Sequence, residues 1–396
     1  MKLTRLFTDF FNSEKSGGLV LIICTAFSLV AANSPIGEHY LELWNLHPAG
    51  HSLQHWINDG LMTVFFLLIG LELEREIYVG ELSDFRNASL PIVAAIGGMV
   101  VPAGIYMMIN SNTVTQAGTG IPMATDIAFA IGILSLLGSR VPSTLKVFLT
   151  ALAVIDDLGA ILVIAFFYTS ALVWSNLLIA MGIFGILVVL NRLRIHLLLP
   201  YIVGGLLMWY FMLNSGIHAT ITGVLLAFAI PFGDGGEKSP SARVQHLLHR
   251  PVAFVILPLF ALANTGIMLG ADWYHNLAEA GSIGIFLGLV VGKPLGIVLF
   301  SMAGVWLGLC SLPGDLKWKH IIGTGLLGGI GFTMSIFIAL QAYLNSGLID
   351  NAKIAVLISS AVSGIGGYFW LRRTLPNDGL HQNMPAINSS HDSPVK

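Results

Sequence analysis

Residues 151–168 read ALAVIDDLGAILVIAFFY and place two adjacent aspartates, Asp156 and Asp157, inside an otherwise apolar run. A run of this kind approaches the roughly 20 residues that a helix needs to cross the hydrocarbon core of a bilayer. A carboxylate at that depth costs about 2.5–3.5 kcal/mol on insertion scales, so its presence indicates a functional site. The stretch therefore predicts a membrane-spanning helix that carries such a site.

The rest of the chain also has the composition of a membrane protein. Of its 396 residues, 55% are hydrophobic and 10% are charged, whereas soluble domains carry about 25% charged residues. The mean hydropathy is +0.80, and the apolar residues gather in blocks of roughly 17–25 residues. We therefore expect an all-α polytopic membrane protein with about twelve spanning helices, near residues 16–32, 60–77, 90–109, 121–137, 146–168, 176–191, 196–213, 216–231, 252–270, 282–304, 320–343 and 353–371.

The basic residues predict the orientation of the chain. If the N-terminus is cytoplasmic, Lys353 alone falls outside and Lys293 lies within a helix, so 17 of the 19 Lys and Arg residues fall inside. Cytoplasmic loops carry such an excess, and we expect both termini in the cytoplasm. Residues 1–373 are expected to form one transmembrane domain, and residues 374–396 have the composition of a disordered tail. The first apolar run lacks a small-residue cleavage site, which favours a retained helix over a signal peptide.

Charge and cysteine content give no sign of other partners. The net charge is −2 and no basic tract is present, so we expect no nucleic-acid partner. Cys24 and Cys310 are too few and too far apart in sequence to suggest a disulfide framework. Membrane lipid is the partner that the composition predicts.

Two of the twelve blocks are poor helices. Residues 118–137, GTGIPMATDIAFAIGILSLL, begin with glycines and a proline, and residues 320–341, HIIGTGLLGGIGFTMSIFIALQ, contain GTG and GGIG. Irregular backbone inside a membrane occurs where it is buried in protein or lines a water-filled cavity. The two blocks are the middle members of the third to fifth and the tenth to twelfth blocks, which predicts an inverted repeat with two broken helices that cross near the midplane. The alternative is that the glycines only permit close helix packing.

Four formal charges lie at the centre of the expected spans: Asp126, Asp156, Asp157 and Lys293. A structural ion pair would use the lysine and one acid, and would leave two aspartates unexplained. Adjacent residues point about 100° apart around a helix, so one aspartate of the pair can bind a cation while the other faces Lys293. Carboxylates are the ligands that hard cations prefer. Because removal from water favours the protonated carboxyl, proton and metal ion would compete for the same oxygens.

Asp126 and Lys293 also have a possible structural role. A broken helix leaves a positive N-terminal end and a negative C-terminal end inside the membrane. An aspartate and a lysine near those ends would neutralise them, and Asp126 follows Thr125 in the first broken block. Pro294, directly after Lys293, is expected to free backbone carbonyl groups locally.

These motifs resemble those of the NhaA family of sodium/proton antiporters. The resemblance rests on ATD (124–126), VIDDLGAI (154–161), VGKPLGI (291–297), GIGFTMS (329–335) and GLELEREI (70–77), and it runs from about residue 10 to residue 373. NhaA is itself among the transporters from which the inverted-repeat rule was drawn, so the repeat is not independent support for the family.

The resemblance implies a secondary transporter of a bacterial inner membrane, with no enzymatic activity and no cofactor. It would export Na⁺ or Li⁺ in exchange for protons, electrogenically and at alkaline pH, in sodium and pH homeostasis. By motif, Asp157 and Asp156 fall on the ion- and proton-binding pair, with Asp157 as the main Na⁺ ligand. Lys293 falls on the lysine that pairs with Asp156, and Thr125 and Asp126 on the broken-helix position. Whether Asp156 or Lys293 releases the second proton stays open.

The resemblance also implies control by pH. The candidate sensors are Glu72, Arg75 and Glu76 at the inner end of the second block, His246 and His249 in the loop before the ninth, and His218 near the outer end of the eighth. Two glutamates one turn apart repel each other, and histidines titrate near neutral pH. The alternative for all six is an ordinary solvated helix end. Gln245 stands where relatives carry an acid, so the pH of activation is expected to differ.

Residues 46–60, LHPAGHSLQHWINDG, form a long His-rich segment between the first two blocks. By composition it is an extracellular loop. The resemblance implies that it forms a small hairpin through which two copies associate as a homodimer.

The motifs argue against several other classes of membrane protein. An intramembrane aspartyl protease would carry GxGD, and a prenyltransferase would carry DDxxD, whereas LGAIL follows Asp157. A cation channel usually places its acids in a ring. An antiporter for K⁺ or Ca²⁺, or a symporter for an organic anion that uses the buried lysine, remains the strongest alternative.

Overall fold

The computed structural model describes residues 14–83, 85–169, 172–233, 235–236, 239–270 and 273–376. Within these ranges every regular element is helical and none is a strand. Eight helices are long and apolar enough to cross a bilayer, and two bent pairs of helices raise the number to ten. The prediction of an all-α polytopic membrane protein is confirmed, and the total of twelve crossings stays a prediction. Most of the expected tail, residues 377–396, lies outside the described residues.

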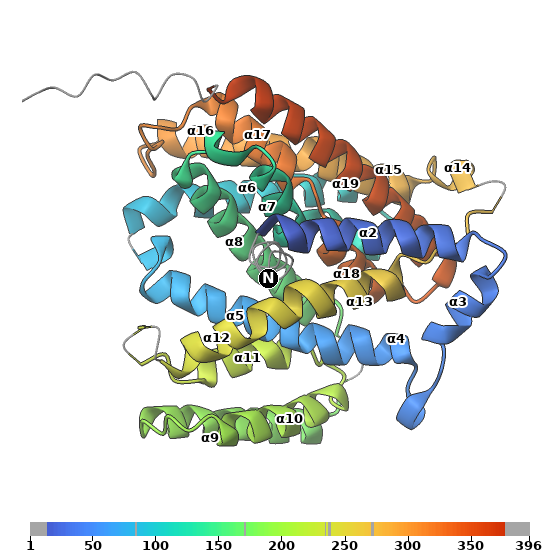
Figure 1. Cartoon of the computed structure of the whole chain (residues 1–396), viewed down its shortest axis with the longest axis vertical. Coiled ribbons are helices and arrows are strands. Elements are labelled where there is room, and N and C mark those ends of the chain that lie inside the picture. Colours follow the sequence, from blue (N-terminus) through green and yellow to red (C-terminus); the bar gives the residue numbers. More distant parts are fainter. Residues whose placement is uncertain are drawn as a thin grey trace, which may run out of the picture.

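The helices follow one another along the chain (Figure 1). The first half contains α2 (Glu14–Ala32), α3 (Gly37–Trp44), α4 (Leu53–His55), α5 (Met62–Tyr78), α6 (Phe85–Asn110), α7 (Ile127–Ser135), α8 (Ser143–Phe167) and α9 (Trp174–Arg192). The second half contains α10 (Leu199–Leu213), α11 (Ile221–Ala229), α12 (Pro240–Pro251), α13 (Leu257–Asn264), α14 (Trp273–Asn276), α15 (Ala280–Leu287), α16 (Lys293–Trp306), α17 (Trp318–Gly328), α18 (Phe332–Ala342) and α19 (Ser346–Thr374). Short 3₁₀ and π turns join several of them.

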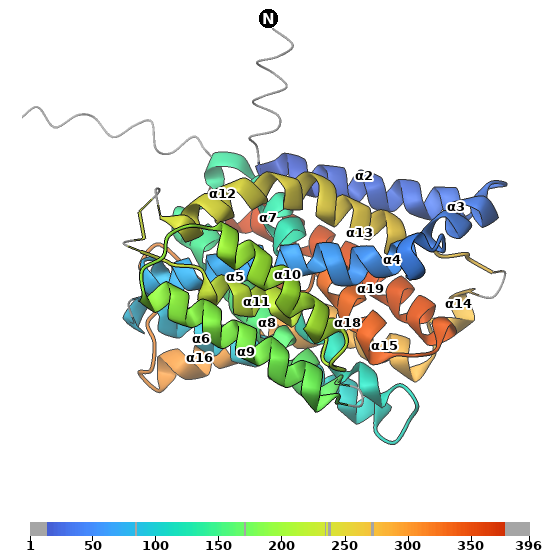
Figure 2. The same cartoon turned by 90° about the horizontal axis from the view of Figure 1, so that it is seen from below.

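Helix α8 lies at the centre of this arrangement. It contacts α5, α6, α7, α17 and α18, and its inward-facing residues belong to the main hydrophobic core. In contrast, α9 and α10 lie side by side at one edge, at the bottom of Figure 1, and α11 joins them to α5. Figure 2 shows the same pair on the outside of the bundle. The fold thus surrounds the two aspartates of α8 with protein on several sides.

Both blocks that the sequence marks as poor helices are interrupted. Residues Gln116–Met123 form a 3₁₀ turn, η4, and the backbone is extended at Ala124 and Asp126 before α7 begins. Helix α17 ends at Gly328, α18 begins at Phe332, and the two axes are bent by 46°. These interruptions place unpaired backbone groups and polar side chains inside the bundle, where they form the site described below.

The helix that precedes α13 begins earlier than expected. Ser239 caps α12 by accepting a hydrogen bond from the N–H of Ala242, and Pro240 occupies the first turn, a position that proline favours. The helix then continues through a π turn, residues Val252–Ile256, to Asn264. The prediction that His246 and His249 lie in a loop is therefore wrong: both lie on α12, whose polar sequence concealed a helix from a reading based on apolar blocks.

Two features position Lys293: a distorted helical turn before it and a close contact between helices α6 and α16. A π turn, η7 (Gly288–Gly292), precedes it in an otherwise continuous helical segment, since Pro294 cannot donate a backbone hydrogen bond. Helix α16 packs against α6 so closely that a Cβ on Gly97 would lie 2.2 Å from the carbonyl oxygen of Gly296. Glycine at both positions lets the two backbones touch one turn from Lys293.

The segment between α3 and α5 differs from its prediction. Residues 48–50 form a 3₁₀ turn, α4 follows at Leu53–His55, and a π turn, η2, spans Trp56–Leu61. Ser52 caps α4 by accepting a hydrogen bond from the N–H of His55. The expected hairpin is therefore wrong for residues 46–60, of which 48–50 and 53–60 are helical and the latter extend α5 toward α3.

Candidate ion-binding site

Asp156 and Asp157 lie on consecutive positions of α8 and are both fully buried. Oδ2 of Asp156 lies 2.9 Å from Nζ of Lys293, whose side chain is also fully buried. Asp157 has a different environment, since neither of its carboxylate oxygens has a hydrogen-bond partner among the described residues. The rotation of about 100° between neighbours on a helix thus separates one paired carboxylate from one unpaired carboxylate.

Thr125 connects Asp156 to the second interrupted helix. Its Oγ1 lies 2.8 Å from Oδ2 of Asp156 and 2.9 Å from the carbonyl oxygen of Gly328, the last residue of α17. A hydroxyl has one proton to donate, so the two acceptors share it. Thr125 therefore responds to the charge of Asp156 and to the position of the end of α17.

Asp126 caps two helices at once. Oδ1 accepts a hydrogen bond from the N–H of Phe129 in the first turn of α7 at 2.9 Å. Oδ2 accepts from the N–H of Thr333 at 3.0 Å and from its hydroxyl at 2.5 Å, in the first turn of α18. The N–H of Asp126 in turn donates to the carbonyl oxygen of Ile330 at 2.7 Å. One carboxylate thus satisfies unpaired N–H groups at two helix N-termini.

The charges match the ends of the interrupted helices. A helix N-terminus carries a partial positive charge and a C-terminus a partial negative charge. Asp126 lies at the N-termini of α7 and α18, whereas the ammonium group of Lys293 donates to the carbonyl oxygen of Met123, where η4 ends. Opposite partial charges are therefore paired where the two interrupted segments are in contact, apart from Asp157 and the Oδ1 atom of Asp156.

The unpaired atoms define what this site can hold. Within the part of the chain that the structure describes, both oxygens of Asp157 and Oδ1 of Asp156 are buried without a hydrogen-bond partner. Such a set of carboxylate oxygens suits a proton or a hard cation. Among the described residues no three His, Cys, Asp or Glu side chains come together, so the oxygens of these two aspartates are the acidic donors of the site.

The residues proposed as pH sensors divide into two groups. Nδ1 of His249 on α12 lies 3.9 Å from Oε1 of Glu72 on α5. Glu76 lies one turn further along α5 and is half-buried. Arg75 and His246 are exposed on the same two helices. The structure thus brings α5 and α12 together at Glu72 and His249.

His218 lies apart from this group. It occupies the turn between α10 and α11, and its Nε2 lies 3.0 Å from the carbonyl oxygen of Tyr168 at the end of α8. Loss of solvent around this partly buried ring lowers the pKa of His218. The six residues therefore form no single cluster.

Sequence reasoning missed several members of the site. Thr333 and the carbonyl groups of Met123, Gly328 and Ile330 complete the crossing. A backbone carbonyl carries no sequence signal. Thr333, which follows GIGF, is a hydroxyl residue directly after a glycine-rich break, and that pattern marks a helix start.

The comparisons with known proteins agree with this geometry. A model of the family described as Na+/H+ antiporter 1 matches residues 8–371. The chain belongs to the Na⁺/H⁺ antiporter family. Among its relatives, a protein named Na(+)/H(+) antiporter NhaA from Flavobacterium psychrophilum is 64% identical over 377 residues, which cover 95% of this chain and 98% of that protein. Antiporters of the same name from Dechloromonas aromatica and Cytophaga hutchinsonii are 61% and 60% identical, with 95% of this chain covered in each case and 98% and 97% of theirs.

Membership in the Na⁺/H⁺ antiporter family confirms the resemblance read from the motifs. It supports a multi-pass transporter of Na⁺ and protons, and not an enzyme. Antiporters of this family work without a cofactor. The roles of individual residues are proposals, to which the geometry above contributes.

Proposed function

We propose that this protein exports Na⁺ or Li⁺ in exchange for protons, and that the cation and the protons compete for the carboxylates of Asp156 and Asp157. The observation that carries the proposal is the contrast between the two neighbours. Asp156 is neutralised by Lys293 at 2.9 Å, whereas Asp157 is buried without a partner for either oxygen. A bare buried carboxylate binds a proton readily, and deprotonates when a cation replaces that proton. Asp157 is thus the main cation ligand.

The exchange ratio follows from the charges of the site. In the proton-loaded state Asp157 is protonated and Asp156 pairs with Lys293, so the site is neutral. When Na⁺ binds, Asp157 releases its proton, and Asp156 joins the ion only if its partnership with Lys293 ends. If Lys293 then loses a proton, two protons leave for each Na⁺ and the cycle is electrogenic. If Asp156 instead carries a proton in the proton-loaded state, Na⁺ binding releases that proton. The count is then again two protons for each Na⁺.

The interrupted helices supply the conformational element of this cycle. Thr125 bonds to Asp156 and to the end of α17, and Asp126 holds the starts of α7 and α18. A change of charge at Asp156 therefore acts directly on the contact between the two broken segments. We propose that these segments form an inverted repeat, cross near the midplane and expose the site to each side in turn.

The setting of the transporter is part of the same proposal. It lies in a bacterial inner membrane with twelve crossings and with both termini in the cytoplasm, as the excess of basic residues on that side supports. It works as a homodimer through residues 46–60, where helical turns take the place of a hairpin. The exposed residues 46–48, 50 and 51 would face the partner, since Leu53, Trp56 and Ile57 line a groove with Leu259 of the same chain. Its physiological roles are sodium and pH homeostasis.

Acid inactivation is assigned to the contact between α5 and α12. Glu72 faces His249, with Arg75, Glu76 and His246 nearby on the same helices. Protonation of Glu72 would remove the carboxylate charge beside His249 and so alter how α12 sits on α5. His218 acts separately, through its contact with the end of α8. Activity is therefore expected to rise toward alkaline pH.

Transport by reconstituted protein tests this proposal. Liposomes that carry an acid interior and a pH dye receive Na⁺, Li⁺ or K⁺ outside, at pH values from 6 to 9. We expect Na⁺ and Li⁺ to collapse the gradient and K⁺ to leave it intact. Asp157→Asn should show no exchange with any of these cations. The control is Asp315→Asn, at an exposed aspartate in the loop between α16 and α17, and its exchange should match that of the unmodified protein. A collapse by K⁺, or none by Na⁺ at any pH, would overturn the assignment.

A further inference from the structure

Two neighbouring hollows are both lined by Trp44, the last residue of α3. The first, the polar pocket, has a volume of about 450 Å³ and is lined in part by Asn45, Gln54, Asp350 and Lys353. The second, the apolar groove, has a volume of about 330 Å³, and its lining consists of Trp44, Leu53, Trp56, Ile57, Gly60, Leu61 and Leu259. Trp44 lines both hollows, so they lie beside each other.

The hollows lie at the level expected for a lipid head group. Helix α3 turns away from α2 by 119°, and one of its faces, with Glu38, His39 and Glu42, is exposed. A short helix of this kind lies along the membrane surface. Trp44 and Trp56 are the residue type that gathers at that surface. The orientation derived from the basic residues puts this end on the outer side.

The polar pocket contains one buried cation and one half-exposed anion. The side chain of Lys353 is 8% exposed and that of Asp350 is 47% exposed, with 3.5 Å between Nζ and Oδ1. This separation exceeds that of a close charge-assisted hydrogen bond, about 2.7–2.9 Å. An ammonium group has three hydrogens to donate. Lys353 therefore keeps donors for an acceptor in the pocket, and Asp350 keeps acceptors for a donor.

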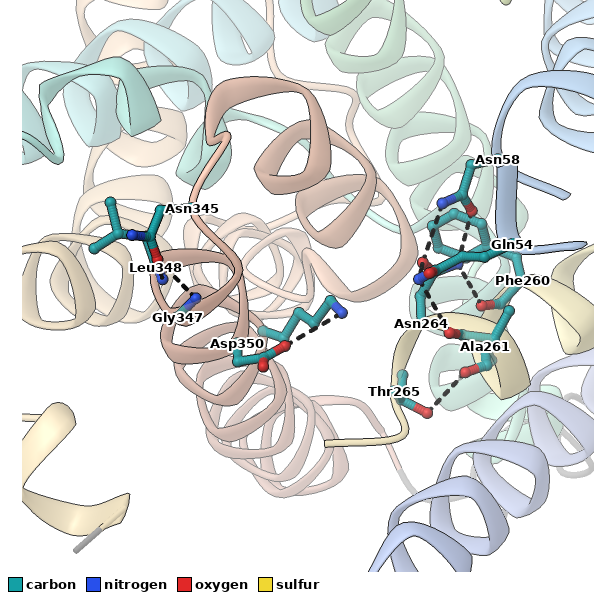
Figure 3. Close-up of polar contacts among 12 residues, drawn as sticks. Gln54, Asn58, Phe260, Ala261, Asn264, Thr265, Asn345, Gly347, Leu348 and Asp350 are labelled. Atoms are coloured by element: carbon teal, nitrogen blue, oxygen red, sulfur yellow. Dashed lines mark hydrogen bonds and ion pairs between the residues drawn. The ribbon is translucent and has the colours of Figure 1, made fainter. Parts of the chain in front are cut away.

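The walls of the pocket are fixed by hydrogen bonds. Figure 3 shows Gln54, Asn58 and Asn264 gathered beside the helix that carries Asp350. Gln54 Nε2 donates to Asn264 Oδ1 at 3.0 Å, and Asn264 Nδ2 donates to Asn58 Oδ1 at 2.8 Å. Tyr40 on α3 donates to the carbonyl oxygen of Leu262 at 2.7 Å. The pocket is thus pre-formed, as ligand sites usually are.

We propose that the polar pocket and the apolar groove bind one phospholipid of the outer leaflet, with an ethanolamine head group. The phosphate would contact Lys353 and the ammonium group would contact Asp350, so each half of the zwitterion meets its opposite charge. One acyl chain would lie in the apolar groove past Trp44. A choline head group has no N–H to donate to Asp350, and a glycerol head group has no cation for it. The two charges together select ethanolamine.

Native mass spectrometry of the purified protein tests this site. The protein is mixed with phosphatidylethanolamine, phosphatidylcholine and phosphatidylglycerol of identical acyl chains, and the bound fraction of each is measured. We expect ethanolamine lipid to be retained at least fivefold over the other two. Lys353→Met should reduce that retention at least fivefold, whereas Lys319→Met, at an exposed lysine at the start of α17, should leave it unchanged.

A second variant separates loss of lipid contacts from loss of folding in Lys353→Met. Leu259→Trp fills the apolar groove without altering a charge, and it should reduce binding of all three lipids. Asp157→Asn should bind ethanolamine lipid like the unmodified protein, so failure of ion exchange and failure of lipid binding are distinguishable. Equal retention of the three lipids, or equal behaviour of the two lysine variants, would disprove the proposal.

Discussion

The ammonium nitrogen of Lys293 lies 2.9 Å from Oδ2 of Asp156, and both side chains are completely buried. Removing one partner of a buried pair leaves an uncompensated charge and costs about 3–5 kcal/mol, whereas replacing both can be neutral. The pair is therefore more informative when its two members are changed together.

The double variant Asp156→Asn with Lys293→Gln should fold and still exchange Na⁺, through Asp157 alone. One proton would then leave for each Na⁺, and the exchange would become electroneutral. The measurement is Na⁺-driven pH change in liposomes at membrane potentials set by K⁺ and valinomycin. The unmodified protein should respond to the potential and the double variant should not. Persistent dependence on potential in the double variant would mean that the second proton does not come from this pair.

The double cap at Asp126 predicts a specific loss of stability. Asp126→Asn keeps one acceptor oxygen for the N–H of Phe129 but cannot also accept from both groups of Thr333. Hydrogen bonds to a charged group are worth about 1.5–3 kcal/mol, so thermal unfolding followed by tryptophan fluorescence should occur at a lower temperature. Thr333→Ser retains the hydroxyl and serves as the control. Unchanged melting of Asp126→Asn would show that the two helix starts do not depend on this carboxylate.

The contact between α6 and α16 predicts a steric effect on exchange. A Cβ on Gly97 would lie 2.2 Å from the carbonyl oxygen of Gly296, so Gly97→Ala must push the helices apart and move Lys293. Gly104, on the same helix, has open space around its Cβ position. In the liposome assay Gly97→Ala should slow exchange at least fivefold, while Gly104→Ala should not. Equal rates would indicate that the position of Lys293 is set by other contacts.

The contact between Glu72 and His249 predicts a change in the pH profile. Glu72→Gln reproduces the neutral state that acid would produce, so exchange at pH 8.5 should fall toward the level of the unmodified protein at pH 6.5. His196→Gln, at an exposed histidine between α9 and α10, is the matched control and should keep the full profile. The proposal fails if Glu72→Gln retains normal alkaline activation.

The site shows how far sequence reasoning reaches. Asp156 and Asp157 are neighbours on one helix, so their different orientations follow from helix geometry, and the charge count alone suggested Lys293 as the partner of one of them. Thr333 and the carbonyl group of Met123 join the site only because two interrupted segments cross, which depends on tertiary packing. No local sequence pattern predicts such a contact.

The errors have physical causes too. Helix α12 carries polar residues on its exposed face, so a reading based on apolar blocks placed His246 and His249 in a loop. The cap at Ser239 with Pro240 was the available signal for its start. Residues 46–60 were assigned by resemblance to a hairpin, while the Ser52 cap and the continuous helical turns that follow it favour a helix.

Proton release on Na⁺ binding to the purified protein is the most direct measurement. Calorimetric titration in two buffers of different ionisation enthalpy counts the protons released for each Na⁺ bound. Competition at Asp156 and Asp157 predicts two protons for the unmodified protein, and neither binding nor release for Asp157→Asn. Sodium binding without proton release, or an Asp157→Asn variant that behaves like the unmodified protein, would contradict exchange at this pair.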